Sequence, residues 1–216
     1  MADICRRYER KFRIEEASLF EIISVLKMHP SSFQTAFDDR RINSIYFDNF
    51  SFSALDQNLA GISKRAKIRL RWYGEELLKV NQPTLEIKMK NNFTNRKESL
   101  ALPSFELNTK FELQDYLMTH GGIKEALYPV CIVRYLRSYY VSQNQRIRAT
   151  IDRAISYYNF QGNIFFNHRP VLDEGIIVEI KYDAKEDENV NEVFQHIPFR
   201  LSKNSKYASS ISALYT

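Results

Sequence analysis

Glycine, cysteine and histidine are scarce in this chain, and each scarcity argues against a class of function. Only 6 of the 216 residues are Gly, and nothing resembles the glycine-rich loop that holds phosphates in P-loop ATPases. The two cysteines, Cys5 and Cys131, lie far apart and form no CxxC pair, so neither a disulfide framework nor a cysteine zinc site is indicated. The 4 His residues are scattered without metal-ligand spacing. The sequence therefore gives no support for a zinc hydrolase or for a Ser-His-Asp enzyme.

Long apolar runs are also missing. No stretch approaches the ~20 apolar residues that span a bilayer. The first residues, Met1 to Arg7, lack the apolar core of a signal peptide. Together with the low cysteine content, these absences favour a protein of the reducing cytoplasm without a membrane segment of its own. A membrane-protein partner and the oligomeric state stay open.

The composition is otherwise that of a globular protein with a basic excess. Hydrophobic residues make up 44% of the chain and charged residues 26%, which is enough for a full core. Lys plus Arg number 31 against 26 Asp plus Glu, so the formal net charge is 31 − 26 = +5. This excess favours an anionic partner but does not choose among nucleic acid, a membrane surface and phosphate compounds.

Two-residue alternation of apolar and polar residues recurs along the chain and predicts strands at residues 4–14, 42–48, 64–73, 83–91, 95–102, 129–141, 146–156 and 175–183. Helical periodicity predicts helices at residues 15–28, 109–119, 187–196 and 203–215. No linker or internal repeat divides the chain, so we expect a single domain over residues 1–216. The expected fold class is α+β, an eight-stranded antiparallel closed β-barrel with helices packed outside, because closure leaves no exposed sheet edge.

Cations fill the polar half of these alternations. In Lys67-Ile68-Arg69-Leu70-Arg71-Trp72 every polar position is a cation, and Lys88, Arg148 and Lys181 continue the pattern on other strands. A solvated sheet face is the ordinary explanation for any one such strand. Taken together, strands this basic are poorly explained without an anion, since like charges on opposite residues destabilise a sheet.

The amphipathic helices need an apolar sheet face to cover. If they pack outside the barrel, the apolar strand residues face outward and the cations line a positively charged tunnel. Such a tunnel suits a slender polyanion, because Arg and Lys bind phosphate oxygens. The carboxylates Glu9, Glu86 and Glu179 interrupt the cations. A divalent cation, Mg²⁺ or Mn²⁺, explains them, because it takes oxygen ligands from carboxylate and phosphate alike.

Six short motifs follow one another along the chain: Arg7-Tyr8-Glu9-Arg10-Lys11-Phe12, Ser44-Ile45-Tyr46-Phe47-Asp48-Asn49, Lys67-Ile68-Arg69-Leu70-Arg71-Trp72-Tyr73-Gly74, Glu86-Ile87-Lys88, Glu179-Ile180-Lys181 and Ser205-Lys206-Tyr207. In this order they resemble the VTC domain, the catalytic domain of the vacuolar transporter chaperone polyphosphate polymerases. That family is a branch of the triphosphate tunnel metalloenzymes. The resemblance implies a metal-dependent phosphotransferase that makes polyphosphate from ATP, releases ADP and uses Mn²⁺ or Mg²⁺.

The resemblance also implies roles for individual residues. It assigns phosphate binding to Lys11, Arg69, Arg71, Lys88, Lys97, Arg137, Arg148 and Lys206, to which the strand pattern adds Lys67 and Lys181. Glu179 is expected to hold the metal, with Glu9 and Glu86 as further carboxylates. Catalysis is expected to fall to Arg69 and Arg71, which stabilise developing charge, and to Lys206 at the start of the last helix.

One departure from the tunnel enzymes bears on the reaction. The tunnel hydrolases typically carry ExExK on the first strand, and here Arg7 occupies the first place. The loss of that carboxylate favours a polymerase over a hydrolase. A tripolyphosphatase or nucleoside triphosphatase stays open, as does a non-catalytic module that binds polyphosphate or nucleic acid. The retained carboxylates argue against a pure binder, and nucleic-acid binding would favour exposed aromatic residues beside the basic ones.

Overall fold

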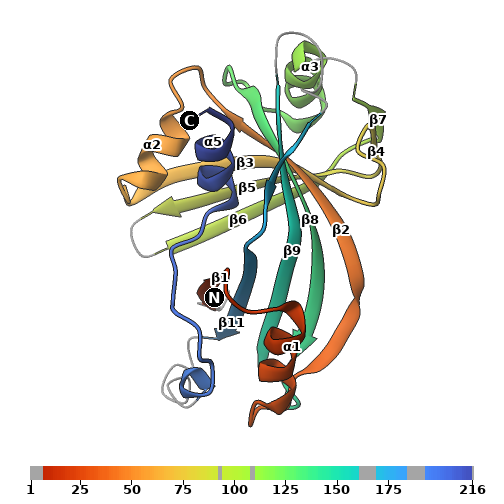
Figure 1. Ribbon diagram of the computed structural model, residues 1–216. Helices are drawn as coiled ribbons and strands as arrows, with labels where there is room; N and C mark the ends of the chain where they lie inside the picture. Colours follow the sequence, from red (N-terminus) through yellow and green to blue (C-terminus); the bar gives the residue numbers. More distant parts are fainter. Residues whose placement is uncertain (1–6, 92–93, 108–109, 161–168, 184–192, 216) are drawn as a thin grey trace. The chain divides into compact units, whose positions relative to one another are not determined.

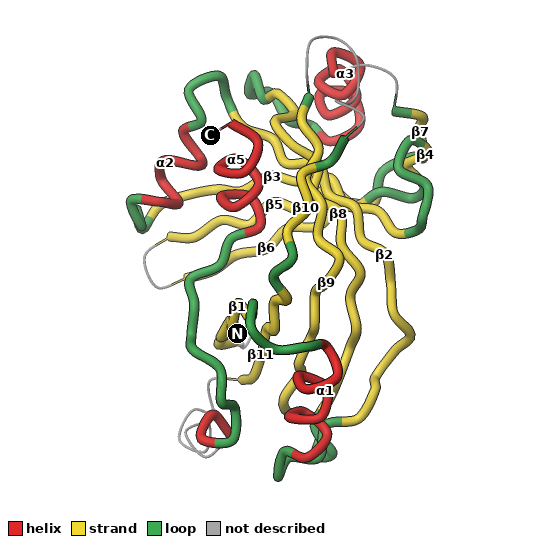
Figure 2. The backbone as a smooth tube through the Cα atoms, in the orientation of Figure 1, coloured by secondary structure: helices red, strands yellow, loops and turns green. Residues whose placement is uncertain are grey.

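The computed structural model describes residues 7–91, 94–107, 110–160, 169–183 and 193–215 (Figures 1 and 2). The chain divides into two compact units. Unit 1 consists of Met1–Arg40, Leu136–Ile155 and Glu174–Asn204, and unit 2 of Arg41–Tyr135, Ser156–Asp173 and Ser205–Thr216. Three strands belong to both units: β2 (Gln34–Asp48), β8 (Tyr128–Val141) and β9 (Ile147–Asn159).

The remaining elements are shorter. The strands are β1 (Arg7–Ile14), β3 (Lys64–Tyr73), β4 (Lys79–Val80), β5 (Thr84–Asn91), β6 (Thr94–Ala101), β7 (Phe105–Glu106), β10 (Val171–Asp173) and β11 (Ile176–Asp183). The helices are α1 (Leu19–Met28), α2 (Ser53–Leu59), α3 (Lys110–Gly121) and α5 (Lys206–Tyr215).

The main sheet is open, so the predicted closed eight-stranded barrel is wrong. Within the described residues its strand order is β1-β11-β9-β8-β2-β3-β5-β6, with β10 beside β9, and β4 and β7 form a separate pair. The end strands β1 and β6 each have one neighbour in this order. β6 carries Arg96, Lys97 and Glu98 in succession, and charged side chains of this kind protect an edge strand from further pairing.

Two parts of the secondary structure were not predicted from the sequence patterns. β2 begins at Gln34 rather than at residue 42, because nearly all of its first residues are exposed and show no apolar alternation. α2 contains no buried residue, so it lacks the apolar stripe from which a helix is predicted. The predicted helix at 187–196 and the start of the predicted strand at 4–14 fall largely or partly outside the described residues.

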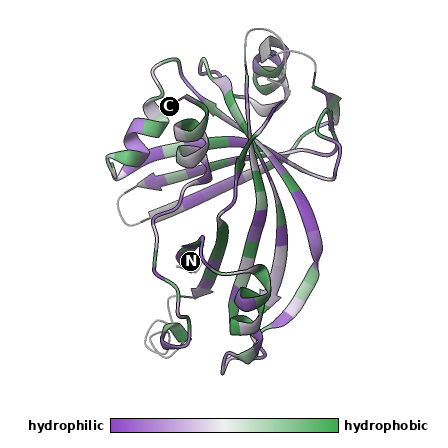
Figure 3. Ribbon diagram, in the orientation of Figure 1, coloured by the Kyte–Doolittle hydropathy of each residue, from purple (hydrophilic) through white to green (hydrophobic). Residues whose placement is uncertain are grey.

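In unit 1 the apolar faces of β1, β9 and β11 pack against α1. The core contains Phe12 of β1, Ile151 of β9 and Ile180 of β11 together with Ile22 and Leu26 of α1. Figure 3 shows the alternation of hydrophilic and hydrophobic residues along the strands that produces this arrangement. α1 begins after Ser18, whose hydroxyl accepts a hydrogen bond from the backbone N–H of Glu21, while the Glu21 carboxylate accepts one from the N–H of Ser18.

In unit 2 the apolar residues of β2, β3, β5 and β8 form a second core with α3. Leu70 and Trp72 of β3, Leu85 of β5, and Leu113 and Leu117 of α3 are all buried there. The prediction that helices cover the apolar side of the strands is thus confirmed for α1 and α3.

α5 does not follow that prediction, because it packs on the polar side of the strands in unit 2. The ring of its Tyr207 stacks on Tyr46 of β2, with ring centroids 5.3 Å apart and planes 17° from parallel. The Tyr207 hydroxyl donates a hydrogen bond to Asp48 at 2.5 Å. Asp48 also accepts from the backbone N–H groups of Ala54 and Leu55, so it caps the start of α2 as well as anchoring α5.

Candidate polyanion-binding site

The predicted cations of unit 2 meet around one buried carboxylate, that of Glu86. The strand register places Tyr46, Arg69 and Glu86 opposite one another on β2, β3 and β5. Arg69 contacts a carboxylate oxygen of Glu86 at 2.5 Å. Lys97 contacts the same carboxylate at 2.6 Å, and Arg71 contacts it at 3.5 Å. Glu86 itself is 4% exposed. Three positively charged side chains therefore share the single negative charge of Glu86.

The electrostatics of this cluster favour the charged forms of Glu86 and Arg69. Burial alone would raise the pKa of Glu86, but Arg69, Arg71 and Lys97 lower it to about 2. Burial would lower the pKa of Arg69, and the neighbouring Tyr46, Glu86 and Tyr135 instead raise it above its usual value. An anion that enters this cluster therefore meets Arg69 as a charged donor.

A row of lysines crosses the same face of the sheet. Lys67 lies opposite Lys88, and Lys88 lies opposite Lys97, on the three neighbouring strands β3, β5 and β6. Like charges placed directly opposite one another destabilise a sheet. The row therefore costs stability in the empty protein, and a bound polyanion would relieve the repulsion.

The start of α5 adds two further groups to this face. Ser205 precedes the helix and accepts a hydrogen bond from Lys67 Nζ at 3.0 Å. The next residue, Lys206, holds its ammonium group 4.7 Å from the centroid of the Tyr135 ring on β8. Unit 2 thus brings together seven of the predicted residues: Lys67, Arg69, Arg71, Lys88, Lys97, Lys206 and Glu86.

Unit 1 contains a second charged cluster, built on β1 and β11. The register places Glu9 opposite Lys181 and Lys11 opposite Glu179. Lys11 contacts Glu9 at 2.8 Å and Glu179 at 3.8 Å, and Lys181 contacts both carboxylates as well. Burial raises the pKa of Glu179, but the positive charges of Lys181, Lys11 and Arg137 more than offset this and hold the pKa well below its usual range.

Arg137 and Arg148 complete the predicted set in unit 1. Arg148 of β9 lies opposite Lys181 of β11 and is exposed. Arg137 of β8 makes two parallel contacts, at 2.5 and 2.7 Å, with Asp152 of β9, which is fully buried. Sequence reasoning assigned no role to Asp152, although it ends the alternation that runs from Arg146 and so falls on the polar face.

Several buried polar atoms on these faces have no hydrogen-bond partner among the described residues. In unit 2 they include the hydroxyl of Ser44 and the Nε–H of Arg71, which lie opposite each other on β2 and β3. In unit 1 the hydroxyl of Thr150 lies opposite Glu179 and is likewise unpartnered. Buried groups of this kind are normally satisfied, so both faces offer unused hydrogen-bonding capacity for a polar ligand.

The carboxylates differ in how well they fit a divalent metal. Glu9 and Glu179 fit better, because they share Lys11 and Lys181 as partners, and an ion that displaced these two ammonium groups would find two carboxylates to bind. Glu86 does not fit, because its two oxygens already contact three cations. In the part of the chain that the structure describes, no group of three or more His, Cys, Asp or Glu residues is placed to hold a metal ion by itself.

The polar side of the strands thus gathers most of the predicted cations, and comparison with known proteins identifies the family. A family model described as the VTC domain matches residues 6–215, and the chain belongs to the VTC-domain family. Comparison with curated proteins gave no match. Among solved structures, a protein from Vibrio parahaemolyticus described as a "putative adenylate cyclase" shares the fold, with a TM-score of 0.57 and 13% identity over 98% of this chain and 100% of that chain. No described helix is long and apolar enough to cross a membrane.

Proposed function

We propose that this chain is a polyphosphate polymerase, which transfers the γ-phosphate of ATP to the end of a growing polyphosphate chain and releases ADP. The observation that carries the proposal is the convergence of Arg69, Arg71 and Lys97 on the single carboxylate of Glu86. Phosphoryl transfer depends mainly on positioning and on neutralising the charge of the transferred group. Three fixed cations with one counter-charge supply that neutralisation.

The nucleophile in this reaction is a phosphate oxygen of the growing chain. It is already an anion, so it needs no protein base to remove a proton. Arg69 and Arg71 would stabilise the charge that develops on the transferred phosphoryl group, and Lys206 would bind a phosphate from the start of α5. The lysine row of Lys67, Lys88 and Lys97 would bind further phosphates of the substrate or product.

Glu179, assisted by Glu9, would hold Mn²⁺ or Mg²⁺ in unit 1. When bound, such an ion supplies charge neutralisation to phosphate oxygens. The lysines that now contact these carboxylates, Lys11 and Lys181, would then be available to phosphate. Arg148 and Arg137 stand beside this group on β9 and β8 and are proposed as further phosphate ligands.

The test is to incubate the purified protein with ATP and Mn²⁺, to resolve the products on a polyacrylamide gel, and to measure ADP and free phosphate in parallel. We expect a ladder of phosphate chains with ADP in matching amount. Free phosphate without chains would show a hydrolase of the same superfamily. Unchanged ATP, in a preparation that still binds tripolyphosphate, would show a binding module. Either of these two results overturns the proposal.

A further inference from the structure

An aromatic and cationic group on β2 and β8 of unit 1 lies outside the residues assigned so far. The rings of Phe37 and Tyr139 meet edge to face, with centroids 5.8 Å apart and planes at 88°. The guanidinium carbon of Arg40 lies 5.3 Å from the centroid of Phe37 and 5.6 Å from that of Tyr139. These three side chains are termed the stacking platform below.

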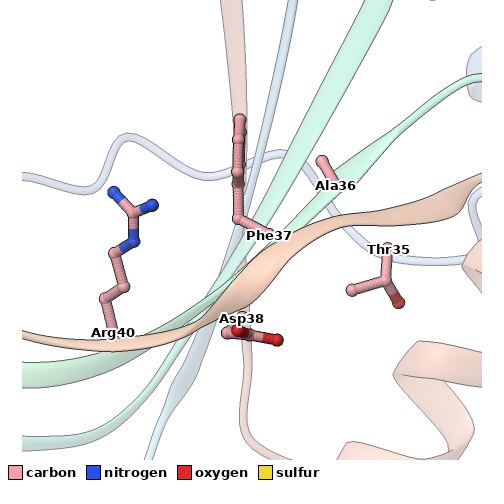
Figure 4. A pocket seen from close by; sticks show the side chains of 5 residues that line it. All are labelled: Thr35, Ala36, Phe37, Asp38 and Arg40. Atoms are coloured by element: carbon pink, nitrogen blue, oxygen red, sulfur yellow. The ribbon is translucent and has the colours of Figure 1, made fainter.

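The backbone of β2 departs from regular strand geometry to form this platform. Phe37 and Arg40 are three residues apart, so strict alternation would place them on opposite faces. Figure 4 instead shows both side chains rising on the same side of the β2 ribbon, in agreement with the contact between them.

The platform is open to solvent. Phe37 is 58% exposed, whereas Phe12 and Phe33 of the same unit are buried in its core. An open hollow of about 420 Å³ adjoins it, lined by Thr35, Ala36, Phe37, Asp38 and Arg40 (Figure 4). Exposure of this ring beside the hollow leaves it accessible to a ligand with a flat, polarisable surface.

The platform also lies next to the charged residues of unit 1. Tyr139 follows Arg137 by two positions on β8, so the two side chains project from the same face, about 7 Å apart along the strand. Arg137 in turn lowers the pKa of Glu179. A ligand whose phosphates occupy these charged residues would therefore have the platform within reach along β8.

We propose that the stacking platform binds the nucleobase of a nucleoside triphosphate whose phosphates occupy the cations of unit 1. This inference rests on the proposed function and adds the part of the substrate that phosphate ligands cannot recognise. Aromatic rings and Arg guanidinium groups bind bases by stacking, and this tolerates different bases because each has a π face. Thr35 and Asp38 also line the hollow, but their side chains project on the other side of the β2 ribbon from Phe37 and Arg40 (Figure 4), so stacking on the platform would hold the base.

The surroundings of the platform favour a nucleobase over an apolar protein or lipid surface. Asp38, Asp39, Arg40 and Arg41 follow Phe37 directly, so charge flanks the ring rather than a continuous apolar patch. Burial of these charges under an apolar partner would be costly. A base is small enough to stack on the platform while the carboxylates of Asp38 and Asp39 stay in water.

The test compares two ligands that share a triphosphate but differ in the base. Binding of ATP and of tripolyphosphate is measured by isothermal titration calorimetry without divalent metal, for the wild-type protein and for Phe37→Ala. We expect Phe37→Ala to weaken ATP binding about tenfold, which corresponds to ~1.4 kcal/mol. We expect the same variant to bind tripolyphosphate within about twofold of wild type, since the phosphate ligands are untouched. Phe37→Trp, which keeps a stacking surface, should restore ATP binding.

Phe20→Ala is the matched control, because Phe20 lies on α1 of the same unit and is 79% exposed. It should bind both ligands as wild type does. Unchanged ATP binding by Phe37→Ala would show that the stacking platform does not bind the base, and would not contradict the proposed function. Equal losses of affinity for ATP and tripolyphosphate would also contradict base binding by the platform. The Phe37 ring would then only hold the phosphate-binding side chains in place. A wild-type protein that binds neither ligand would contradict the proposed function and the platform together.

Discussion

Arg69 of β3 and Glu86 of β5 lie opposite each other in the sheet, and their side chains meet at 2.5 Å on a face shared with Arg71 and Lys97. In the empty protein Glu86 occupies the position of an anion among these cations. A phosphate that enters must compete with Glu86 for the same donors. The carboxylate would therefore stabilise the empty protein and, under the proposed function, limit the affinity for phosphate at the same time.

Replacement of Glu86 should separate these two effects. We expect Glu86→Gln to lower the free energy of unfolding by roughly 3 kcal/mol, because it leaves three close cations without a counter-charge. The same variant should bind tripolyphosphate more tightly than wild type and recover most of its lost stability when the ligand is present. Chemical denaturation with and without tripolyphosphate measures both. Weaker tripolyphosphate binding by this variant would show that Glu86 is not a competitor of the ligand.

The low pKa of Glu86 predicts a loss of stability in acid. Its pKa is about 2 in the folded protein, compared with ~4.3 in an unfolded chain. A lowered pKa contributes stability that is fully present above the unfolded value and is lost as the pH falls towards the folded value. We expect the free energy of unfolding to fall between about pH 4.3 and pH 2, and Glu86→Gln to flatten this dependence. An unaltered pH dependence in the variant would contradict the ion cluster.

Glu179 is predicted to act through the metal rather than through phosphate binding. Glu179→Gln should raise the Mn²⁺ concentration needed for half-maximal turnover about tenfold or more, while tripolyphosphate binding without metal stays at least as tight as in wild type. Glu174→Gln, an exposed carboxylate that precedes β11, is the matched control. If both variants show the wild-type Mn²⁺ dependence, Glu179 does not hold the metal.

Lys206 is predicted to contribute directly to turnover. Its ammonium group lies over Tyr135 at the start of α5, on the face that carries Arg69 and Glu86. Lys206→Ala should reduce kcat/KM at least about tenfold, or ~1.4 kcal/mol of transition-state stabilisation. Lys79→Ala, at a 60% exposed lysine of β4 in the same unit, should leave it unchanged. Near-normal kinetics of Lys206→Ala over a range of ATP concentrations would show that Lys206 does not contribute to turnover.

The sequence predicts the strands and their faces well because alternation reports directly which side of a strand is buried. The cations of β3 and the apolar residues beneath α1 and α3 were placed in this way. Sheet closure was not predictable, since it depends on whether the end strands β1 and β6 meet, and neither strand's own residues encode that. The pairing of Arg137 with Asp152 depends on the register between two strands, which alternation leaves undetermined.

The stacking platform escaped prediction for a different reason. Its residues Phe37 and Arg40 precede the apolar part of β2, in a stretch where most side chains are exposed. The local break in alternation brings them together, and a rule based on strict alternation assigns them to opposite faces. A search for aromatic and basic residues three apart at the exposed end of a strand would have found them.

The central claim is that one face of the sheet binds polyphosphate, and two adjacent residues of β6 test it most directly. Lys97 lies opposite Lys88 and contacts Glu86, whereas Arg96 lies opposite Met89 and pairs with Glu98, so the two cations belong to opposite faces. Each alanine variant removes one positive charge. Tripolyphosphate affinity is measured by calorimetry at about 0.15 M salt, where exposed charges are screened within ~8 Å. We predict that Lys97→Ala weakens binding about fivefold or more and Arg96→Ala less than about twofold. Equal effects of the two substitutions would show that net charge, and not this face, attracts the anion.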